Sequence, residues 1–335
     1  MLPRKIGNSI IPAIGFGTGG LGVAGYGPLT SFEDRVKIFD FLYEAGCTHW
    51  DTAEVYGEGE ALIGEWLRRT GKRSEVFIAT KFGYTHEWVR GDAEYVKEAA
   101  ERSLRTLGVD YIDLYYQHRP DPNTPIELTI KAMAELVKDG KIKHIGLSDP
   151  SVETLRRAHA THPIAAIQVE FSPLVLDATQ PPHDLIQAAK ELGVAVIVYS
   201  PLARGFITGR FTSLKQLDPT DYRLQIARYS EKNIAGILDT VSQIESIGKK
   251  HIATAAQVTL AWALAQGDNF FVIPGAKDVK RIQENLGSLK VKLSAEEVEE
   301  MWNIARNANK VVTGDRDIPW GVAAAYTDTP VLMKS

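Results

Sequence analysis

The chain has 335 residues, a length at which an α/β barrel still forms one domain. With 44% hydrophobic and 24% charged residues, it has the composition of a globular protein that can bury a large core. Its formal net charge of −4 argues against nucleic-acid binding, and its single cysteine, Cys47, excludes an internal disulfide.

The beginning of the chain and its apolar runs indicate neither export nor a membrane. Residues 1–5 are not followed by the apolar stretch of a signal peptide, and no apolar run approaches the length of a membrane-spanning helix. A lone cysteine also fits a reducing compartment. We therefore expect a cytoplasmic protein without a membrane partner, and a monomer by default.

Short apolar runs alternate with longer amphipathic segments along most of the chain. This alternation is typical of βαβ units and a parallel sheet. Strands are expected at residues 14–17, 48–51, 76–81, 112–118, 143–148, 166–170, 195–200 and 270–274.

The segments between these runs carry the apolar spacing of helices, as Val36, Phe39 and Leu42 do in the first of them. Ser151 suits the N-cap of the helix after the fifth strand, and Gly193 follows the end of the next helix. Helices are expected at residues 33–45, 60–69, 93–107, 125–138, 152–160, 182–192, 254–265, 278–286 and 294–308.

Three segments fall outside this repeat. Residues 1–13 contain two short apolar runs around Gly7-Asn8, which is a hairpin signal, and could close the bottom of a barrel. Residues 201–229 form a long connection after the seventh strand, and residues 309–335 form an irregular tail. No domain boundary is evident, so residues 1–335 are expected to form one domain with its barrel at about 14–290.

Eight strands can form an open doubly wound sheet, but two observations favour a (β/α)8 TIM barrel. The glycines after the first strand are not followed by the helix that a dinucleotide-binding Gly-x-Gly-x-x-Gly motif requires. In a barrel the C-terminal ends of all strands meet at one mouth, where such enzymes keep their active sites. Polar residues or glycine stand at these ends: Thr18, Asp51, Lys81, His118, Ser148, Gln168, Ser200 and Gly275.

The densest group of reactive residues begins at Asp51, with Tyr56 following in a glycine-rich turn. Taken alone, Asp51 could cap a turn, and Tyr56 and His118 could be packing residues. Lys81 could reach solvent with its ammonium. Together the four residues form a coherent proton-transfer unit. A free tyrosine has a pKa of about 10, and an adjacent ammonium stabilises the tyrosinate. An aspartate keeps the ammonium charged and in place, and a histidine can orient the substrate oxygen.

Three motifs resemble the signatures of the aldo-keto reductase family. Residues 46–57 resemble the first signature, residues 104–114 the middle one, and residues 272–277, with Arg281, Glu284 and Asn285, the third. The resemblance covers roughly residues 6–290, with every element in order. Within the family, the chain is most similar to a group that includes plant and fungal reductases, pyridoxal reductases and potassium-channel β subunits.

The resemblance implies reduction of a carbonyl compound by NADPH, with a catalytic tetrad and a set of cofactor contacts. The tetrad positions are Asp51, Tyr56, Lys81 and His118. The implied cofactor contacts are Gly17, Thr18 and Asp51; Ser148 and Gln168 at the nicotinamide carboxamide; Tyr199 against the nicotinamide ring; Ser200, Leu202, Arg204 and Arg210 along the pyrophosphate, with Arg223 beside them; Gly275, Lys277 and Arg281 at the 2′-phosphate; and Glu284 and Asn285 at the adenine.

The charges of Lys277 and Arg281 also favour NADPH over NADH on physical grounds. The two residues are four apart at the start of a helix, so they share one face, and a helix N-terminus attracts anions. Two cations suit a 2′-phosphate better than a bare ribose; the other interpretation is a solvated basic helix face. Asp149 departs from the family pattern, because many relatives carry Asn there. Its carboxylate could weaken cofactor binding or simply face away.

Our hypothesis is hydride transfer from NADPH to an aldehyde or ketone, with Tyr56 as proton donor and His118 as a second donor to the same oxygen. One alternative is a lyase or aldolase that forms a Schiff base on Lys81. Another is an NADPH-binding regulatory subunit with little turnover. No His, Cys or carboxylate cluster has the spacing of metal ligands, so no metal is expected.

Aromatic residues in the loops are the candidate substrate contacts and indicate an apolar or aromatic carbonyl compound. Each of them could equally be a packing residue. They are Tyr26, Tyr84, Trp88, Phe206 and Trp320, in addition to His118.

Overall fold

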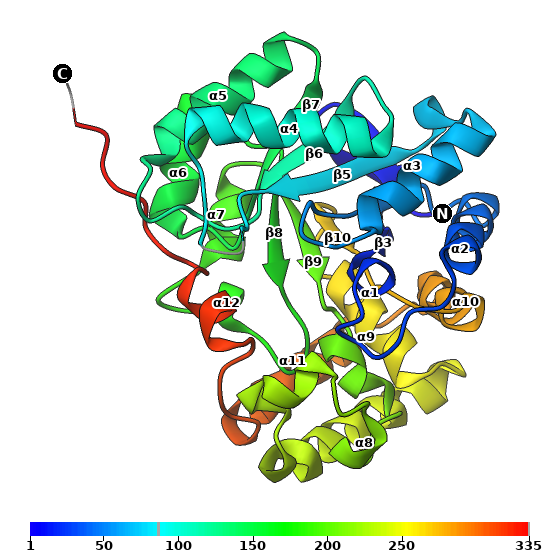
Figure 1. The fold of residues 1–335 in the computed structure, drawn as a ribbon. Coiled ribbons are helices and arrows are strands. Elements are labelled where there is room, and N and C mark those ends of the chain that lie inside the picture. Colours follow the sequence, from blue (N-terminus) through cyan, green and yellow to red (C-terminus); the bar gives the residue numbers. More distant parts are fainter. Residues whose placement is uncertain (86–87, 334–335) are drawn as a thin grey trace.

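The computed structural model describes residues 1–85 and 88–333, apart from the side chain of Trp320 (Figure 1). Within this part of the chain, eight parallel strands form one sheet in the order β10-β9-β8-β7-β6-β5-β4-β3. Ile14, just before β3, forms a parallel bridge with Val272 of β10, and this bridge closes the sheet. The predicted (β/α)8 barrel is therefore confirmed. The strands are β3 (Phe16–Gly17), β4 (His49–Asp51), β5 (Phe77–Phe82), β6 (Ile112–Gln117), β7 (Ile142–Ser148), β8 (Ala166–Glu170), β9 (Ala195–Tyr199) and β10 (Phe270–Val272).

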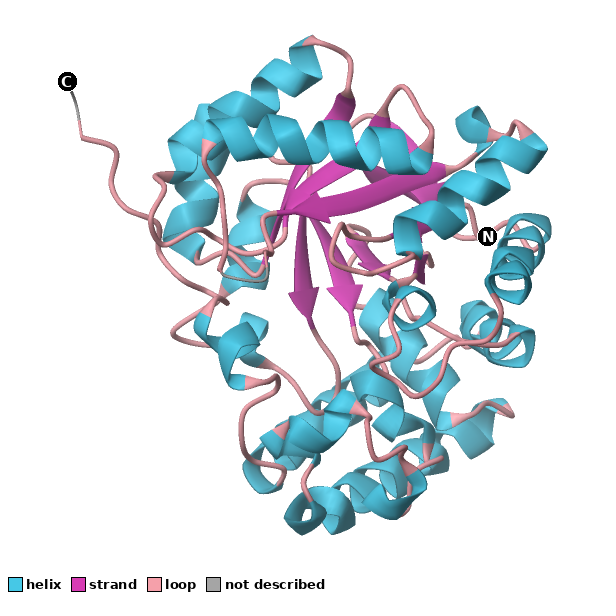
Figure 2. Ribbon diagram, in the orientation of Figure 1, coloured by secondary structure: helices cyan, strands magenta, loops and turns pink. Residues whose placement is uncertain are grey.

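Helices surround the strands on the outer side of the barrel (Figure 2). The predicted helices between strands are α2 (Phe32–Glu44), α3 (Gly59–Thr70), α4 (Ala93–Leu107), α5 (Ile126–Lys138), α6 (Val152–Thr161), α7 (Leu185–Glu191) and α9 (Ala255–Leu264), and α10 (Val279–Gly287) follows β10. The Ser151 hydroxyl caps α6 by accepting from the Thr154 amide, at 3.0 Å, as expected. Helix α7 begins at Leu185 rather than at residue 182, because Asp184 has a φ of 38°, outside the right-handed helical region.

Three helices were not predicted from the sequence. Helix α8 (Ile234–His251) packs against α9 and α11 (Ala295–Val311), and two short helices, α1 (Gly19–Gly22) and α12 (Pro319–Ala323), lie in loops. In α8, the buried Ile237, Val241, Ile244 and Ile247 recur with helical spacing. The helical spacing was thus present in the sequence, but the connection between β9 and β10 holds two helices, α8 and α9, where a βα repeat requires only one. In residues 1–85 and 88–333, no helix is both long and apolar enough to cross a membrane.

The N-terminal hairpin closes the bottom of the barrel, as its sequence indicated. Strands β1 (Pro3–Ile6) and β2 (Ser9–Pro12) pair antiparallel through a turn in which Gly7 has a φ of 56°. Ile6 is fully buried, and the Ser9 hydroxyl is 3.0 Å from Nε2 of His144, near the start of β7. Because β7 begins at this end of the barrel, the hairpin lies opposite the mouth.

The alternation of side chains along β5 places one residue in the mouth and its neighbour outside the barrel. Thr80 donates to Oε1 of Glu60 in α3, at 2.7 Å, whereas Lys81 faces Asp51 of β4.

Cys47, before β4, is buried with its thiol 3.6 Å from the Ile14 carbonyl oxygen, and burial raises its pKa to about 12.

The C-terminal segment, residues 312–333, crosses from α11 to the outer surface of α6 (Figure 1, red). On the way, the Tyr326 amide donates to the carbonyl oxygen of Asp149, just after β7, at 2.7 Å. Farther along, Arg157 of α6 donates to the carbonyl oxygens of Thr329, at 2.9 Å, and Pro330, at 2.6 Å. The irregular tail predicted from the sequence is therefore a well-anchored strap beside the mouth.

Candidate active site

The four candidate catalytic residues come from three neighbouring strand ends. Asp51 is the last residue of β4, Lys81 lies in β5 opposite Tyr116 of β6, and His118 follows β6, where its amide donates to the Phe82 carbonyl. Tyr56 lies in the turn between β4 and α3. The structure thus brings these four residues to the same mouth.

Lys81 and Asp51 form a buried ion pair at the centre of this group. The Lys81 ammonium donates to Oδ1 of Asp51 and, at 2.8 Å, to the Thr52 carbonyl. The Gln168 amide donates to the other Asp51 oxygen, at 2.8 Å. Burial raises the pKa of Asp51, and the charge of Lys81 opposes that shift. Lys81 Nζ is 4.9 Å from the centroid of the Tyr56 ring, so a fixed positive charge stands beside the candidate proton donor.

His118 lies against the rings of Tyr56 and Tyr84, with centroid distances of 5.6 Å and 5.1 Å. Burial lowers its pKa well below the ordinary value, and the charges of Lys81 and Arg119 lower it further. The ring is therefore neutral near neutral pH. In the described part of the chain, its Nδ1 atom is buried and finds no hydrogen-bond partner. Such a ring can offer a hydrogen bond to a substrate oxygen without carrying a charge.

The residues expected at the nicotinamide lie on the adjacent strand ends and are held by two arginines. Ser148 accepts from Nη1 of Arg119, at 3.0 Å. The Tyr199 hydroxyl donates to Oδ2 of Asp149, at 2.8 Å, and accepts from Nη1 of Arg316, at 2.7 Å. Roles for Arg119 and Arg316 were not predicted, since neither residue belongs to a recognised motif.

Asp149, the departure from the family pattern, is fully buried and paired. Nη2 of Arg316 is 2.9 Å and Nη2 of Arg119 is 3.5 Å from its Oδ2 atom. Burial alone would raise the pKa of Asp149, but the two arginines outweigh burial and hold the pKa below its ordinary value. The carboxylate is thus an ion with two guanidinium partners.

A second group of cations lies at the start of α10. Lys277 donates to the carbonyl oxygens of Tyr26, at 2.9 Å, and Gly27, at 3.1 Å. Burial lowers the pKa of Lys277, and nearby arginines lower it further. They are Arg223, Arg281 and Arg210. Because these charges destabilise one another, an anion bound among them would be stabilised.

Two glycines beside these cations allow two strand ends to pack closely against each other. A Cβ atom on Gly17 would lie 2.8 Å from the Ile273 carbonyl oxygen, and one on Gly275 would lie 2.9 Å from that of Gly17. The backbones at the ends of β3 and β10 therefore approach as closely as only glycine allows. The group of cations fits the phosphates of a phosphorylated dinucleotide such as NADPH.

Some expected site residues are engaged elsewhere. The Arg204 side chain is buried; it donates to the Arg316 carbonyl, at 2.8 Å, and lies 3.4 Å from Glu170, so it does not face open space for a pyrophosphate. Phe206 is fully buried and stacks on Tyr229 at 4.4 Å. In this arrangement the Phe206 ring has no exposed surface, so its expected place in the substrate pocket stays a prediction.

The remaining expected residues have mixed surroundings. The hydroxyl groups of Tyr26 and Tyr222 form a hydrogen bond, at 2.7 Å. Tyr84 is partly exposed and lies against His118, and Trp88, in the same loop as Tyr84, is also partly exposed. The side chain of Trp320 lies outside the described part of the structure. Thr18, Ser148, Gln168, Leu202 and Asn285 are buried, whereas Ser200, Glu284 and Arg281 are partly exposed and Arg210 is exposed.

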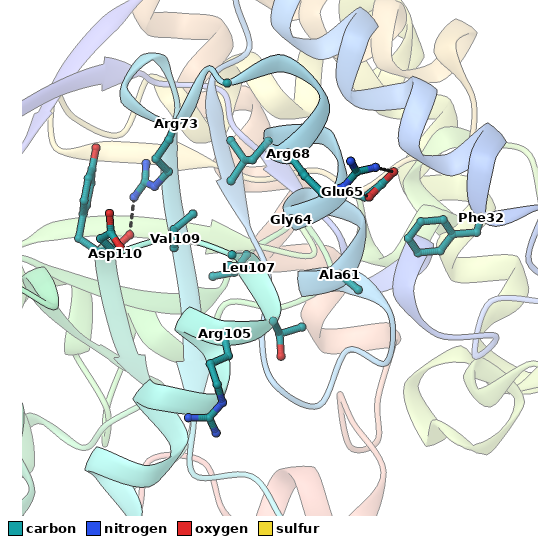
Figure 3. A pocket seen from close by; sticks show the side chains of 15 residues that line it. Phe32, Ala61, Gly64, Glu65, Arg68, Arg73, Arg105, Leu107, Val109 and Asp110 are labelled. Carbon is teal, nitrogen blue, oxygen red and sulfur yellow. Dashed lines mark hydrogen bonds and ion pairs between the residues drawn. The ribbon is translucent and has the colours of Figure 1, made fainter.

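Two surface cavities lie away from the mouth, and none of these residues lines either of them. The larger, about 560 Å³, lies on the outer surface where Gly64 and Arg68 of α3 approach Leu107 and the turn after α4 (Figure 3). Its arginines include Arg73, which is paired with Asp113 at 2.7 Å. Among the described residues, no group of three or more His, Cys, Asp or Glu side chains could hold a metal ion.

Comparisons with known proteins agree with this geometry. The chain matches the Aldo/keto reductase family over residues 13–306. It is 52% identical over 333 residues to aldo-keto reductase str7 of Strobilurus tenacellus, covering 98% of each chain. It is 42% identical over 339 residues to aldo-keto reductase yakc [NADP(+)] of Schizosaccharomyces pombe, covering 99% of this chain and 98% of the relative.

Solved structures show the same architecture. The aldo-keto reductase Tm1743, in complex with the inhibitor epalrestat, superposes with a TM-score of 0.74 at 33% identity, covering 91% of this chain and 100% of that one. The glycerol dehydrogenase AKR11B4 of Gluconobacter oxydans has a TM-score of 0.81 at 24% identity, covering 92% and 96%, and supports the fold alone. The chain belongs to the aldo/keto reductase family and is an enzyme that reduces carbonyl groups.

Proposed function

We propose that the protein reduces an aldehyde or ketone to an alcohol with NADPH, and that Tyr56 donates the proton. One observation carries this proposal: the buried Lys81 ammonium, fixed by Asp51, lies 4.9 Å from the Tyr56 ring centroid at the barrel mouth. A cation in this position stabilises the tyrosinate that remains after proton transfer.

When bound, NADPH would supply a hydride to the carbonyl carbon. The Tyr56 hydroxyl would protonate the oxygen on which negative charge develops. His118 would donate a second hydrogen bond to that oxygen and set its orientation. Because burial keeps the histidine neutral, it remains a hydrogen-bond donor rather than a competing acid.

The proposed cofactor contacts divide into two groups. Tyr199 would lie against the nicotinamide ring, with Ser148 and Gln168 at its carboxamide. Lys277 and Arg281 would bind the 2′-phosphate, which gives the preference for NADPH over NADH, and Arg210 would bind the pyrophosphate. The printed name of the fission-yeast relative, which includes NADP(+), supports this choice.

Neither alternative is favoured. A Schiff-base lyase needs an uncharged lysine that can approach a carbonyl group, whereas the Lys81 ammonium is buried and donates to Asp51 and to the Thr52 carbonyl. A regulatory subunit with little turnover would not need the complete tetrad.

The aromatic residues Tyr84 and Trp88 support an apolar or aromatic carbonyl substrate. A cytoplasmic location and a monomeric state stay predictions.

The test is the Tyr56→Phe variant, assayed with a panel of aldehydes, ketones and pyridoxal against NADPH and NADH. We expect turnover to fall by about 10²- to 10⁴-fold, with NADPH binding retained, because only the proton donor is lost. Tyr43→Phe, on the outer helix α2, is the matched control and should keep wild-type turnover. Wild-type turnover in Tyr56→Phe would disprove the proton-donor role.

A further inference from the structure

Arg316, from the C-terminal segment, connects three consecutive strand ends at the mouth. Its Nη2 atom donates to Asp149, just after β7, at 2.9 Å. Its Nη1 atom donates to Glu170 at the end of β8, at 2.8 Å, and to the Tyr199 hydroxyl at the end of β9, at 2.7 Å. The Arg316 side chain is only 5% exposed. One residue of the strap is therefore built into the mouth of the barrel.

The charges in this cluster depend on one another. Asp149 and Glu170 are fully buried, and a buried carboxylate requires a counter-charge. Apart from Arg316, Asp149 has Arg119 at 3.5 Å, and Glu170 has Arg204 at 3.4 Å. Loss of Arg316 would leave each carboxylate with one more distant partner.

The cluster also touches the residues assigned to the nicotinamide. Tyr199 donates to Asp149 and accepts from Arg316, so its hydroxyl is fixed from both sides. Arg119 donates to Ser148, the residue before Asp149. An unpaired charge on Asp149 would therefore act directly on Tyr199 and, through Arg119, on Ser148.

We propose that Arg316 is a positioning residue for the cofactor, because it neutralises Asp149 and fixes the Tyr199 ring at the nicotinamide site. The C-terminal strap then forms part of that site, and the arginine explains why this chain tolerates an aspartate at position 149. The inference rests on the proposed function, since it takes Tyr199 and Ser148 as nicotinamide contacts.

Neutralisation of Asp149 has a pH signature that a loosened structure would not produce. The charged or titratable groups facing Asp149 are Arg119 after β6, Tyr199 on β9, and Arg316 and Tyr326 in the strap, with Glu170 and Arg204 next to them. With both arginines present, the pKa of Asp149 stays below its ordinary value. Without Arg316, only Arg119 at 3.5 Å and the Tyr199 hydroxyl still oppose the effect of burial, so we expect the pKa of Asp149 to rise and the carboxylate to become neutral at a higher pH than in wild type. The affinity of an Arg316 variant for NADPH should therefore recover as the pH falls.

The experiment measures NADPH binding by fluorescence titration, without substrate, at about pH 6 and about pH 8. The variants are Arg316→Met, Arg316→Lys and the double variant Asp149→Asn/Arg316→Met. We expect Arg316→Met to raise the Kd about tenfold or more at the higher pH, relative to wild type, and clearly less at the lower pH. The double variant should return to within about threefold of wild type at both pH values, since no buried charge remains at position 149.

Arg157→Met is the matched control, because Arg157 anchors the same strap to α6, away from Tyr199. It should lower the melting temperature and leave the Kd unchanged. If Arg316→Met does not fold, Arg316→Lys carries the test. Its single ammonium cannot bridge Asp149, Glu170 and Tyr199 at once, so we expect an intermediate, pH-dependent loss of NADPH affinity.

Three results would overturn the inference: unchanged NADPH affinity in Arg316→Met and Arg316→Lys, a loss that Asp149→Asn does not relieve, or an equal loss in Arg157→Met. Failure of the wild-type protein to bind NADPH would instead overturn the proposed function. The two failures are therefore distinguishable.

Discussion

The two ends of the barrel each bury a histidine, but the surroundings of the two rings differ. At the mouth, His118 lies 5.6 Å from the Tyr56 ring, near Lys81 and Arg119. At the bottom, His49 contacts the rings of Phe77 and Phe271, at 5.5 Å and 6.1 Å. Burial lowers the pKa of both histidines, that of His49 to about 4.

A shifted pKa by itself therefore does not identify an active site in this barrel. The mouth is distinguished by its partners, since an ammonium, a carboxylate and a phenol converge beside His118. The bottom is closed by the hairpin and surrounded by apolar rings. Changes at the mouth should consequently alter the chemistry, whereas changes at the bottom should alter only stability.

The largest effect is expected at the mouth, for Lys81→Met. Turnover should fall by about a thousandfold, because the tyrosinate loses its neighbouring cation. The free energy of unfolding should fall by about 3–5 kcal/mol, because Asp51 is left buried and unpaired. Steady-state kinetics and chemical denaturation measure the two effects. In Asp51→Asn/Lys81→Met, stability should return and turnover should not; recovery of both would contradict the catalytic role of Lys81.

The double variant Lys277→Ala/Arg281→Ala should weaken NADPH binding by about 10- to 100-fold. The loss arises because two charged partners of the 2′-phosphate are removed, so NADH binding should change little. Titration of wild type and the double variant with NADPH and with NADH measures both losses of affinity. Lys280→Ala, an exposed lysine of the same helix, is the control. An equal loss for both cofactors would remove the argument for a phosphate site.

At the bottom, His49→Leu should make the protein less sensitive to acid. The folded pKa of His49 is about 4. Its unfolded value is about 6.5, so the unfolded chain takes up a proton first as the pH falls, and stability is lost between these values. Between about pH 8 and pH 5, wild type should lose about 2 kcal/mol more than the variant. Denaturation at the two pH values tests this, with His162→Leu as the control. If wild type and His49→Leu lose the same stability between the two pH values, His49 does not remain neutral on folding.

The smallest effect is expected for Ser9→Ala in the hairpin. It removes the hydrogen bond between Ser9 and His144, and the protein should lose about 1 kcal/mol of stability. Turnover should stay at the wild-type value, because the hairpin is at the end of the barrel opposite Tyr56. A fall in turnover without a fall in stability would contradict the prediction that changes at the bottom of the barrel alter only stability.

The barrel, and the convergence of the four tetrad residues at its mouth, could be predicted because both depend on local patterns; the catalytic roles of these residues stay predictions. Strands such as β5 are short apolar runs, and Asp51, Lys81 and His118 stand at or next to strand ends. Helix α8 was not predicted although Ile237 and Ile244 carry its spacing, because a βα repeat requires one helix between β9 and β10, and α9 already fills that place.

Other features could not be read from the sequence, because they arise only when distant segments meet. Arg316 lies in the tail, and its partners Asp149 and Glu170 come from two separate strands. Phe206 is one aromatic residue among many in long loops, and only the folded chain shows that its face is covered by Tyr229.

The buried thiol of Cys47 has a practical consequence for spectroscopy. It is the single cysteine of the chain, it is inaccessible, and burial keeps it protonated. Maleimide dyes will therefore react with a cysteine introduced at a chosen surface position without prior removal of the native one. Two such labels, one on the strap and one on α6, would report by energy transfer whether the strap separates from the barrel during turnover.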